Sequence, residues 1–342
     1  MRRCAPPHAG IGPLALHAVD RCIRFYRGRR ACELVSATQL PAGNGRVLTE
    51  LRVRAPLVAQ SSAHNSGGGL DGGATSHEAG DYCFVCVPAV AALEWHPFSI
   101  SSAPVAAGTS ESGALVSFHI LATGGADSFT SRLAAWAAGG DLTGNRQVLL
   151  DGPYGRISLR GWRTAYAALV LCAGGVGVTP LAAALDELLA LHRAGRLAHC
   201  RAVHLVWVVG GGDAEPFRRW FPALLAAAHA AGAPFHLHLH ATETKATAGA
   251  QGSGVNGGNA DDIEAPLLNA VAASADPADP QALPPLQKGR PNYAQIFAEI
   301  VAQLGDDARV GVLSCGPQSM VDAVRCGASA RGFDQHEECF LL

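Results

Sequence analysis

The sequence has few aromatic residues and almost no net charge. Phe, Trp and Tyr make up 6% of its 342 residues, although 49% are hydrophobic, because many of its apolar residues are small. We therefore expect parts of the chain to be loosely packed. The formal net charge of -2 leaves no basic face of the kind that binds nucleic acid, so we expect no nucleic-acid partner. The length is sufficient for two domains, each with its own apolar core.

No apolar run has the length and composition of a membrane span, which needs about 20 residues. The longest run without charge, at 166–185, contains Gly174, Gly175, Gly177 and Pro180 at its centre, which favours a strand, a tight loop and a helix start. The amino terminus offers only an interrupted stretch at 9–19, and the basic residues after it do not resemble a signal peptide. As given, we expect a soluble cytoplasmic chain.

The ten cysteines are scattered through a chain too large to need disulfides, which indicates reduced thiols in a cytosolic compartment. Cys83 and Cys86 form a CxxC motif. They lie in a strand-like run at 81–87 with no second pair of ligands nearby, so we interpret them as core cysteines and expect no metal site.

Up to about residue 160 the pattern predicts short antiparallel strands. Apolar and polar residues alternate at 32–59 around a turn at 41–45, and strand signals return at 82–88, 97–101, 114–121 and 147–150. Strands at this spacing predict a small barrel. The segment 61–80 is rich in Gly, Ser and Ala and is expected to be a mobile insertion.

After Gly161 strands alternate with helices, which predicts a parallel sheet with crossover helices. Strands are expected at 167–172, 202–209, 235–241 and 309–314, and helices at 180–193, 216–231, 292–304 and 318–328. The segment 242–288 is poor in bulky apolar residues and is expected to be a second mobile insertion.

A glycine-rich loop follows the first of these strands. Gly174, Gly175 and Gly177 let the backbone approach a phosphate, and the helix that follows aims its amide groups at that position. The loop is not a GxGxxG fingerprint, and an isolated glycine turn is equally compatible with tight packing. Both interpretations remain open at this point.

Several motifs occur in an order that resembles ferric-chelate reductases and NADPH oxidases, from about Leu16 to the end of the chain. They are His96-Pro97-Phe98-Ser99-Ile100, Asp151-Gly152-Pro153-Tyr154-Gly155, the glycine loop at 174–180, the strand at 203–208, Gly289-Arg290-Pro291-Asn292 and Cys315-Gly316-Pro317. The resemblance implies a ferredoxin reductase-like fold. A juxtamembrane-like segment at 1–30 would precede a six-stranded antiparallel FAD-binding barrel at 31–160 and a parallel-sheet NAD(P)H-binding α/β domain at 161–342, with residues 151–155 as the turn that closes the barrel.

The resemblance also assigns flavin contacts. His96 would contact the flavin diphosphate, Phe98 would pack against the ring after Pro97, and Ser99 would donate a hydrogen bond near the reactive flavin nitrogen. A surface His and a core Phe beside an edge Pro is the alternative for this strand. The next flavin contact corresponds to His119, Ile120 and Thr130, with Leu121 and Phe129 standing where the family has a basic residue and a Trp.

The same resemblance assigns the nicotinamide cofactor. The expected contacts to its diphosphate are Gly174, Gly175, Gly177, Thr179 and Pro180. Cys315, Gly316 and Pro317 would border the nicotinamide at the end of a parallel strand, and Arg290 would meet the extra phosphate of NADPH. Gly210 and the two glycines after it replace a second basic residue, which leaves NADH open. Phe340 would cover the flavin until nicotinamide displaces it.

The function implied is transfer of hydride from NADPH to FAD and of single electrons onward to haem, ferric chelate or dioxygen, with Ser99, Cys315 and Phe340 nearest the chemistry. Haem is expected only in a missing membrane part. The expected partner is thus a haem-bearing membrane domain or a separate electron acceptor, with this module on the cytosolic face. The alternatives are a freestanding NAD(P)H diaphorase, a degenerate interaction module without catalysis and a truncated gene model.

Overall fold

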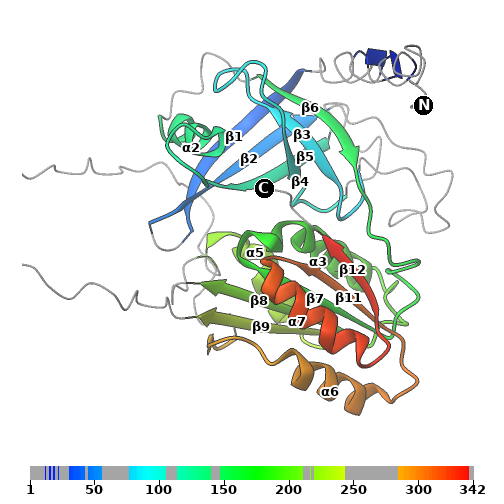
Figure 1. Ribbon diagram of the computed structural model, residues 1–342. Coiled ribbons are helices and arrows are strands. Elements are labelled where there is room, and N and C mark those ends of the chain that lie inside the picture. Colours follow the sequence, from blue (N-terminus) through cyan, green and yellow to red (C-terminus); the bar gives the residue numbers. More distant parts are fainter. Residues whose placement is uncertain are drawn as a thin grey trace, which may run out of the picture.

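The computed structural model contains two six-stranded sheets, one above the other in Figure 1. It describes residues 31–42, 45–55, 77–104, 114–139, 147–210, 219–242 and 284–338, with single positions at 12, 15, 16, 18, 19, 22 and 216. Most of the predicted segments 1–30, 61–80 and 242–288 therefore lies outside the described residues, as does Phe340. Within the described ranges, no helix is long and apolar enough to cross a membrane.

The first sheet is antiparallel throughout and has the strand order β4-β3-β6-β1-β2-β5. Its strands are β1 (Ala31–Pro41), β2 (Val47–Ala55), β3 (Tyr82–Cys86), β4 (His96–Ser99), β5 (Ala114–Leu121) and β6 (Gln147–Tyr154). Just beyond β4, the N–H of Ser101 donates to the carbonyl of Ser117 on β5 at 2.9 Å. This bond joins the two ends of the sheet and confirms the predicted antiparallel barrel.

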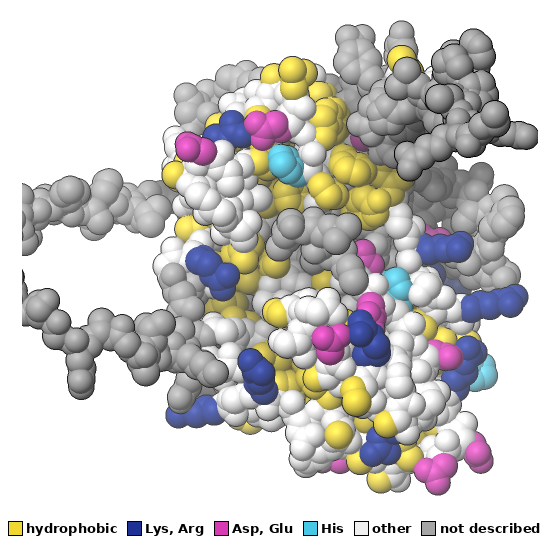
Figure 2. Space-filling view, viewed as in Figure 1, with side chains coloured by type: hydrophobic (Ala, Val, Ile, Leu, Met, Phe, Trp, Pro, Cys, Tyr) yellow, Lys and Arg dark blue, Asp and Glu magenta, His cyan; other side chains and the backbone are white. Residues whose placement is uncertain are grey.

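Alternation along β2 shows why the sequence forms a barrel wall. Leu51 and Val53 are buried in the barrel core, whereas Arg52 between them is exposed. Cys83 and Cys86 are both buried in β3, which confirms that this CxxC motif is part of the core. Figure 2 shows hydrophobic side chains gathered on the barrel in this view.

A helix at one end of the barrel was not predicted. It is α2 (Phe129–Ala138), which buries Phe129 and Leu133 in the barrel core, and Ser128 caps it by accepting a hydrogen bond from the Ser131 N–H at 3.2 Å. The helix is mostly small and polar residues, so its apolar stripe gave a weak pattern.

The second sheet is parallel and has the order β10-β9-β8-β7-β11-β12. Its strands are β7 (Ala168–Gly174), β8 (Ala202–Gly210), β9 (Phe235–Thr242), β10 (Gln287–Lys288), β11 (Val310–Cys315) and β12 (Asp334–Glu338). The helices are η2 (Gly175–Gly177), α3 (Val178–Arg193), α5 (Pro222–Ala231), α6 (Tyr293–Leu304) and α7 (Gln318–Ser329). Every residue of β7 is buried, as expected for a strand covered on both faces.

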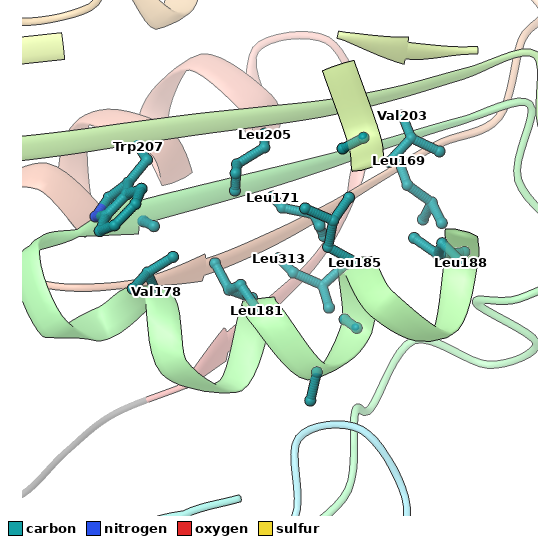
Figure 3. Close-up of a cluster of buried hydrophobic side chains, with 14 of the residues drawn as sticks. Leu169, Leu171, Val178, Leu181, Leu185, Leu188, Val203, Leu205, Trp207 and Leu313 are labelled. Carbon is teal, nitrogen blue, oxygen red and sulfur yellow. The ribbon is translucent and has the colours of Figure 1, made fainter. Parts of the chain in front are cut away.

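Helices cover both faces of this sheet. On one face, α3 packs against the strands, with Leu181 and Leu185 beside Leu205 and Leu313 in the cluster of Figure 3. On the other face, α6 and α7 pack in a separate cluster through residues such as Phe297. The two-sided arrangement confirms the α/β domain that the alternating pattern predicts.

Four local expectations need correction. The helix expected at 216–231 is broken before Pro222, where α5 begins, because proline suits the first turn of a helix. Residues 151–154, predicted as a closing turn, belong to strand β6, which pairs with β3 as far as Tyr154. The end of the predicted insertion at 242–288 forms edge strand β10, and Ala79 in the other insertion is buried. Strands β10 and β12 were not predicted.

The two sheets share an apolar cluster. Ala42 and Leu48 from the hairpin of β1 and β2 belong to the same buried cluster as α3 and β7. In addition, the indole N–H of Trp220 donates to the carbonyl of Pro41 at 2.8 Å. These contacts fix the barrel against the second sheet.

Candidate active site

Strand β4 ends at a buried hydroxyl, that of Ser99. Ser99 pairs with Tyr82 on β3 and is only 4% exposed. Its Oγ has no hydrogen-bond partner among the described residues. A buried hydroxyl without a partner is costly unless another group satisfies it. The position therefore fits a bound flavin, whose ring edge would accept this hydrogen bond.

His96 opens the same strand and lies in a small aromatic and charged group. The His96 ring stacks on the Phe129 ring of α2, with centroids 4.3 Å apart. The centroid of the Phe98 ring lies 6.3 Å from that of Phe129. His96 Nε2 is 3.5 Å from the carboxylate of Glu94. The guanidinium of Arg132 holds both oxygens of Glu94 at 2.8 Å and keeps the pKa of that carboxyl below its usual value.

Arg132 was missed by sequence analysis. It lies in the first turn and a half of α2, so the spacing from Thr130 would have suggested it once that helix was recognised. Arg132 shares the Glu94 carboxylate with His96, and planar guanidinium groups bind anions such as the diphosphate of FAD well. Arg132 thus brings a positive charge to this end of the barrel, whereas Leu121, at the position where the family has a basic residue, brings none.

Other residues predicted to contact flavin make protein contacts. The Thr130 hydroxyl accepts from the Thr123 N–H at 3.0 Å and donates to the Thr123 carbonyl at 3.0 Å, which pins that loop to α2. Ile120 is buried in the barrel core. His119 is buried between the two sheets, with Nδ1 2.8 Å from Ser101 Oγ. Their contacts to flavin stay predictions.

The glycine loop and the Cys315-Gly316-Pro317 turn touch each other, because β7 and β11 are neighbours and Ala173 pairs with Cys315. A Cβ added to Gly174 would lie 2.5 Å from Pro317 Cδ, and one added to Gly177 would lie 2.6 Å from the Cys315 carbonyl carbon. Both turns therefore depend on the absence of side chains at these glycines.

Gly175 differs from its neighbours. It has a φ of +55°, and a Cβ there would meet nothing within 4 Å. It opens η2 and is followed by α3, whose first amide groups have no side-chain cap. The uncapped helix start beside open space fits a diphosphate. The Thr179 hydroxyl donates to the Val176 carbonyl at 2.9 Å, and Pro180 is buried in α3, so their side chains shape the turn.

The remaining predicted residues follow the carboxyl edge of the sheet. Arg290 is exposed and follows β10, whose Gln287 pairs with His240 on β9. Cys315 is fully buried and pairs with Glu338 of β12. The predicted residues of this domain thus lie along the carboxyl edge, where parallel sheets commonly bind ligands, although β10 and β11 are separated by three strands. Phe340 stays a prediction.

Asp81 lies beside the end of β4 and is close to carboxylates that include one of the second sheet. It accepts a hydrogen bond from the Glu78 N–H at 2.8 Å, and its carbonyl accepts from the Ile100 N–H at 2.9 Å. Burial raises the pKa of Asp81 to about 7, and the nearby Glu78 and Glu338 carboxylates contribute to the rise. Glu338 pairs with Cys315, so one of the carboxylates that raise the pKa of Asp81 comes from the strand next to β11 in the second sheet.

A flavin-type antiparallel barrel followed by a parallel nucleotide-binding sheet defines an NAD(P)H-dependent flavin oxidoreductase module. Residues 73–158 match the model of an FAD-binding domain, and residues 166–329 match that of the ferric reductase NAD binding domain. The chain belongs to the ferric reductase and NADPH oxidase family of FAD- and NAD(P)H-binding modules.

Curated relatives agree with this assignment. The chain is 26% identical to a superoxide-generating NADPH oxidase heavy chain of Dictyostelium discoideum, over 90% of this chain and 52% of that protein. It is 29% identical to ferric reduction oxidase 7, chloroplastic, of Arabidopsis thaliana, over 59% and 25% respectively. Human NADPH oxidase 3 is 28% identical over 63% of this chain and 33% of its own length. The chain thus spans about half or less of these relatives.

Solved structures share the fold. A cytochrome P450 reductase from Amycolatopsis superposes with a TM-score of 0.53 at 17% identity, covering 91% of this chain and 69% of that one. The FAD/NAD binding domain of a nitric oxide dioxygenase from Vibrio cholerae gives 0.51 at 16% identity, covering 92% and 99%. Ferredoxin-NADP+ reductase from Plasmodium falciparum gives 0.51 at 13% identity, covering 90% and 96%. These likenesses confirm the ferredoxin reductase-like fold.

Proposed function

We propose that this chain takes electrons from NADPH at a bound FAD and passes them singly to an acceptor, as ferric-chelate reductases and NADPH oxidases do. FAD supplies the redox chemistry, because it accepts a hydride and releases electrons one at a time. The protein's task is to bind and orient the two nucleotides. The observation that carries the proposal is the buried Ser99 hydroxyl without a partner among the described residues, on the strand where a flavin ring edge is expected.

Each side of the site then has a role. Ser99 donates to the flavin edge, and His96 with Arg132 faces the flavin diphosphate. The open backbone at Gly175 and the start of α3 hold the NADPH diphosphate, and the turn at 315–317 borders the nicotinamide. Arg290, exposed beyond β10, meets the additional phosphate of NADPH.

The acceptor lies beyond this chain's own residues. The relatives are longer proteins whose names include ferric reduction and superoxide generation. We propose a haem-bearing membrane domain as the natural partner, with this module on its cytosolic face, and ferric chelate or dioxygen as the final acceptor. A freestanding NAD(P)H diaphorase would instead reduce soluble quinones.

The test begins with the purified protein reconstituted with FAD. Anaerobic NADPH should bleach the flavin absorbance, and Ser99→Ala should slow the bleaching about tenfold or more while FAD remains bound, since one hydrogen bond to the reacting ring is lost. Ser36→Ala, a matched change on β1 of the same barrel, should bleach at the normal rate. A protein that binds no FAD would refute the proposal and favour an interaction module. NADPH-driven reduction of ferric chelate, compared with superoxide production and quinone reduction, identifies the acceptor.

A further inference from the structure

A line of contacts crosses from the flavin strand into the second domain. Ser101, just beyond β4, places its hydroxyl 2.8 Å from His119 Nδ1 and 2.9 Å from the Ser117 carbonyl. The His119 ring in turn lies on the ring of Phe221, with centroids 4.3 Å apart and planes 36° apart. Phe221 immediately precedes α5, so this contact joins the barrel to the nucleotide-binding domain.

The line continues to the glycine loop. Trp220, next to Phe221, holds the barrel through its hydrogen bond to Pro41 and lies 5.7 Å from the ring of Trp207 on β8. The Trp207 indole N–H donates to the Gly175 carbonyl at 3.0 Å. Trp207 is fully buried and Trp220 nearly so. A continuous path of contacts therefore runs from Ser101 in the barrel to Gly175 in the second domain.

We propose that His119, Trp220, Phe221 and Trp207 form an interdomain strut that positions the glycine loop relative to the flavin strand. They are positioning residues for electron transfer from NADPH to FAD, and the proposal rests on the function proposed above. Transfer requires reacting atoms within about 3 to 3.5 Å, and a displacement of about 1 Å can cost about a hundredfold in rate. The strut acts on rate because it sets the separation of two bound nucleotides, while each nucleotide keeps its own contacts.

The polar ends of the strut distinguish it from ordinary packing. Apolar packing alone would need no directed bonds, yet each end is fixed by one: Ser101 to His119 in the barrel and Trp207 to the Gly175 carbonyl. The Gly175 bond fixes the one loop residue with φ of +55° and open space beside it. A change that keeps an aromatic ring but removes the indole N–H therefore tests the bond to Gly175 with the loss of only part of the buried side chain.

Trp207→Phe is that change. In stopped-flow measurements with the FAD-loaded protein, the limiting rate of flavin reduction by NADPH should fall about tenfold, while the dissociation constants of FAD and NADPH change less than about threefold. The long-wavelength absorbance band of stacked flavin and nicotinamide should weaken in parallel. In the protein without cofactors, amide exchange at 175–177 should quicken while exchange in β7 stays unchanged.

Trp136→Phe on α2 is the matched control, because Trp136 packs against the barrel core outside the strut, and it should match wild type in all four measurements. Ser101→Ala tests the other end and should slow reduction with little change in affinity. A wild-type rate in Trp207→Phe, or a loss confined to NADPH affinity, overturns the strut. If wild-type protein itself is not reduced by NADPH, the proposed function fails, whereas a normal wild type with an unaffected variant refutes the strut alone.

Discussion

Acidification should weaken the second domain through His204, which belongs to a group of four histidines on one face of its sheet. His204 lies on β8, and His236, His238 and His240 alternate along β9. His204 Nδ1 is 3.0 Å from His238 Nε2, and its ring stacks on His236 at 4.6 Å. This face is covered by α6, whose Glu299 raises the pKa of His238 slightly against the larger effect of burial, which lowers it.

The magnitude follows from His204. Burial lowers its pKa to about 3, and the neighbouring His236 and His238 contribute. An unfolded histidine has a pKa of about 6.5, so the unfolded chain binds the proton more readily. The stability is complete above pH 6.5 and is lost as pH falls toward 3. At pH 5, about 1.5 units below 6.5, the loss from this one group is about 2 kcal/mol at about 1.4 kcal/mol per unit.

Urea unfolding followed by far-ultraviolet circular dichroism at pH 7 and pH 5 measures this loss. His204→Asn keeps an amide near the position of Nδ1 but cannot take up the proton, so its free energy of unfolding should fall by about 2 kcal/mol less than that of wild type over this interval. His199→Asn, at an exposed position, should follow wild type. Equal losses in wild type and His204→Asn would refute the reasoning.

Two further predictions concern the site. Asp81→Asn should stabilise the protein at pH 8 by up to about 4 kcal/mol. Burial raises the pKa of Asp81 to about 7 in the folded protein, so the wild-type protein loses stability as the pH rises from about 4 to 7, whereas the Asn variant does not. The melting temperatures of the two proteins should therefore converge at about pH 4, and a difference that stays constant across pH would contradict this. Gly177→Ala should abolish NADPH binding in a fluorescence titration, because its Cβ would overlap the Cys315 carbonyl, whereas Gly125→Ala, where a Cβ meets nothing within 4 Å, should bind normally.

The sequence predicted the elements whose own residues show a clear hydrophobic pattern. Alternation marked β1 and β2, and an uninterrupted apolar run followed by glycines marked β7 and the loop before α3. These signals are strong because burial on one or both faces dictates the residue types. α2 has only a few bulky residues in its buried stripe, and β10 is two residues long, so neither shows a recognisable hydrophobic periodicity in the sequence.

Long-range contacts could not be predicted in the same way. Glu94 and Arg132 are 38 positions apart, and Trp220 and Pro41 are 179 apart. Each partner alone resembles an ordinary surface charge or an ordinary core aromatic. The first pairing exists because α2 packs on the barrel beside β4, and the second because the barrel meets the second sheet. No spacing rule within one element encodes either contact.

The glycine loop shows how two interpretations of one motif can both hold. Tight packing and phosphate binding were alternatives for the loop as a whole, and the structure shows tight packing at Gly174 and Gly177 but not at Gly175. Gly174 and Gly177 leave no room for a Cβ because the turn at 315–317 presses against them, whereas Gly175 faces open space. Close packing of the first pair brings the ends of β7 and β11 together, and that contact, with the Trp207 bond to the Gly175 carbonyl, holds the open residue at the start of α3. The packing is therefore the means by which a phosphate-binding backbone would be kept in place.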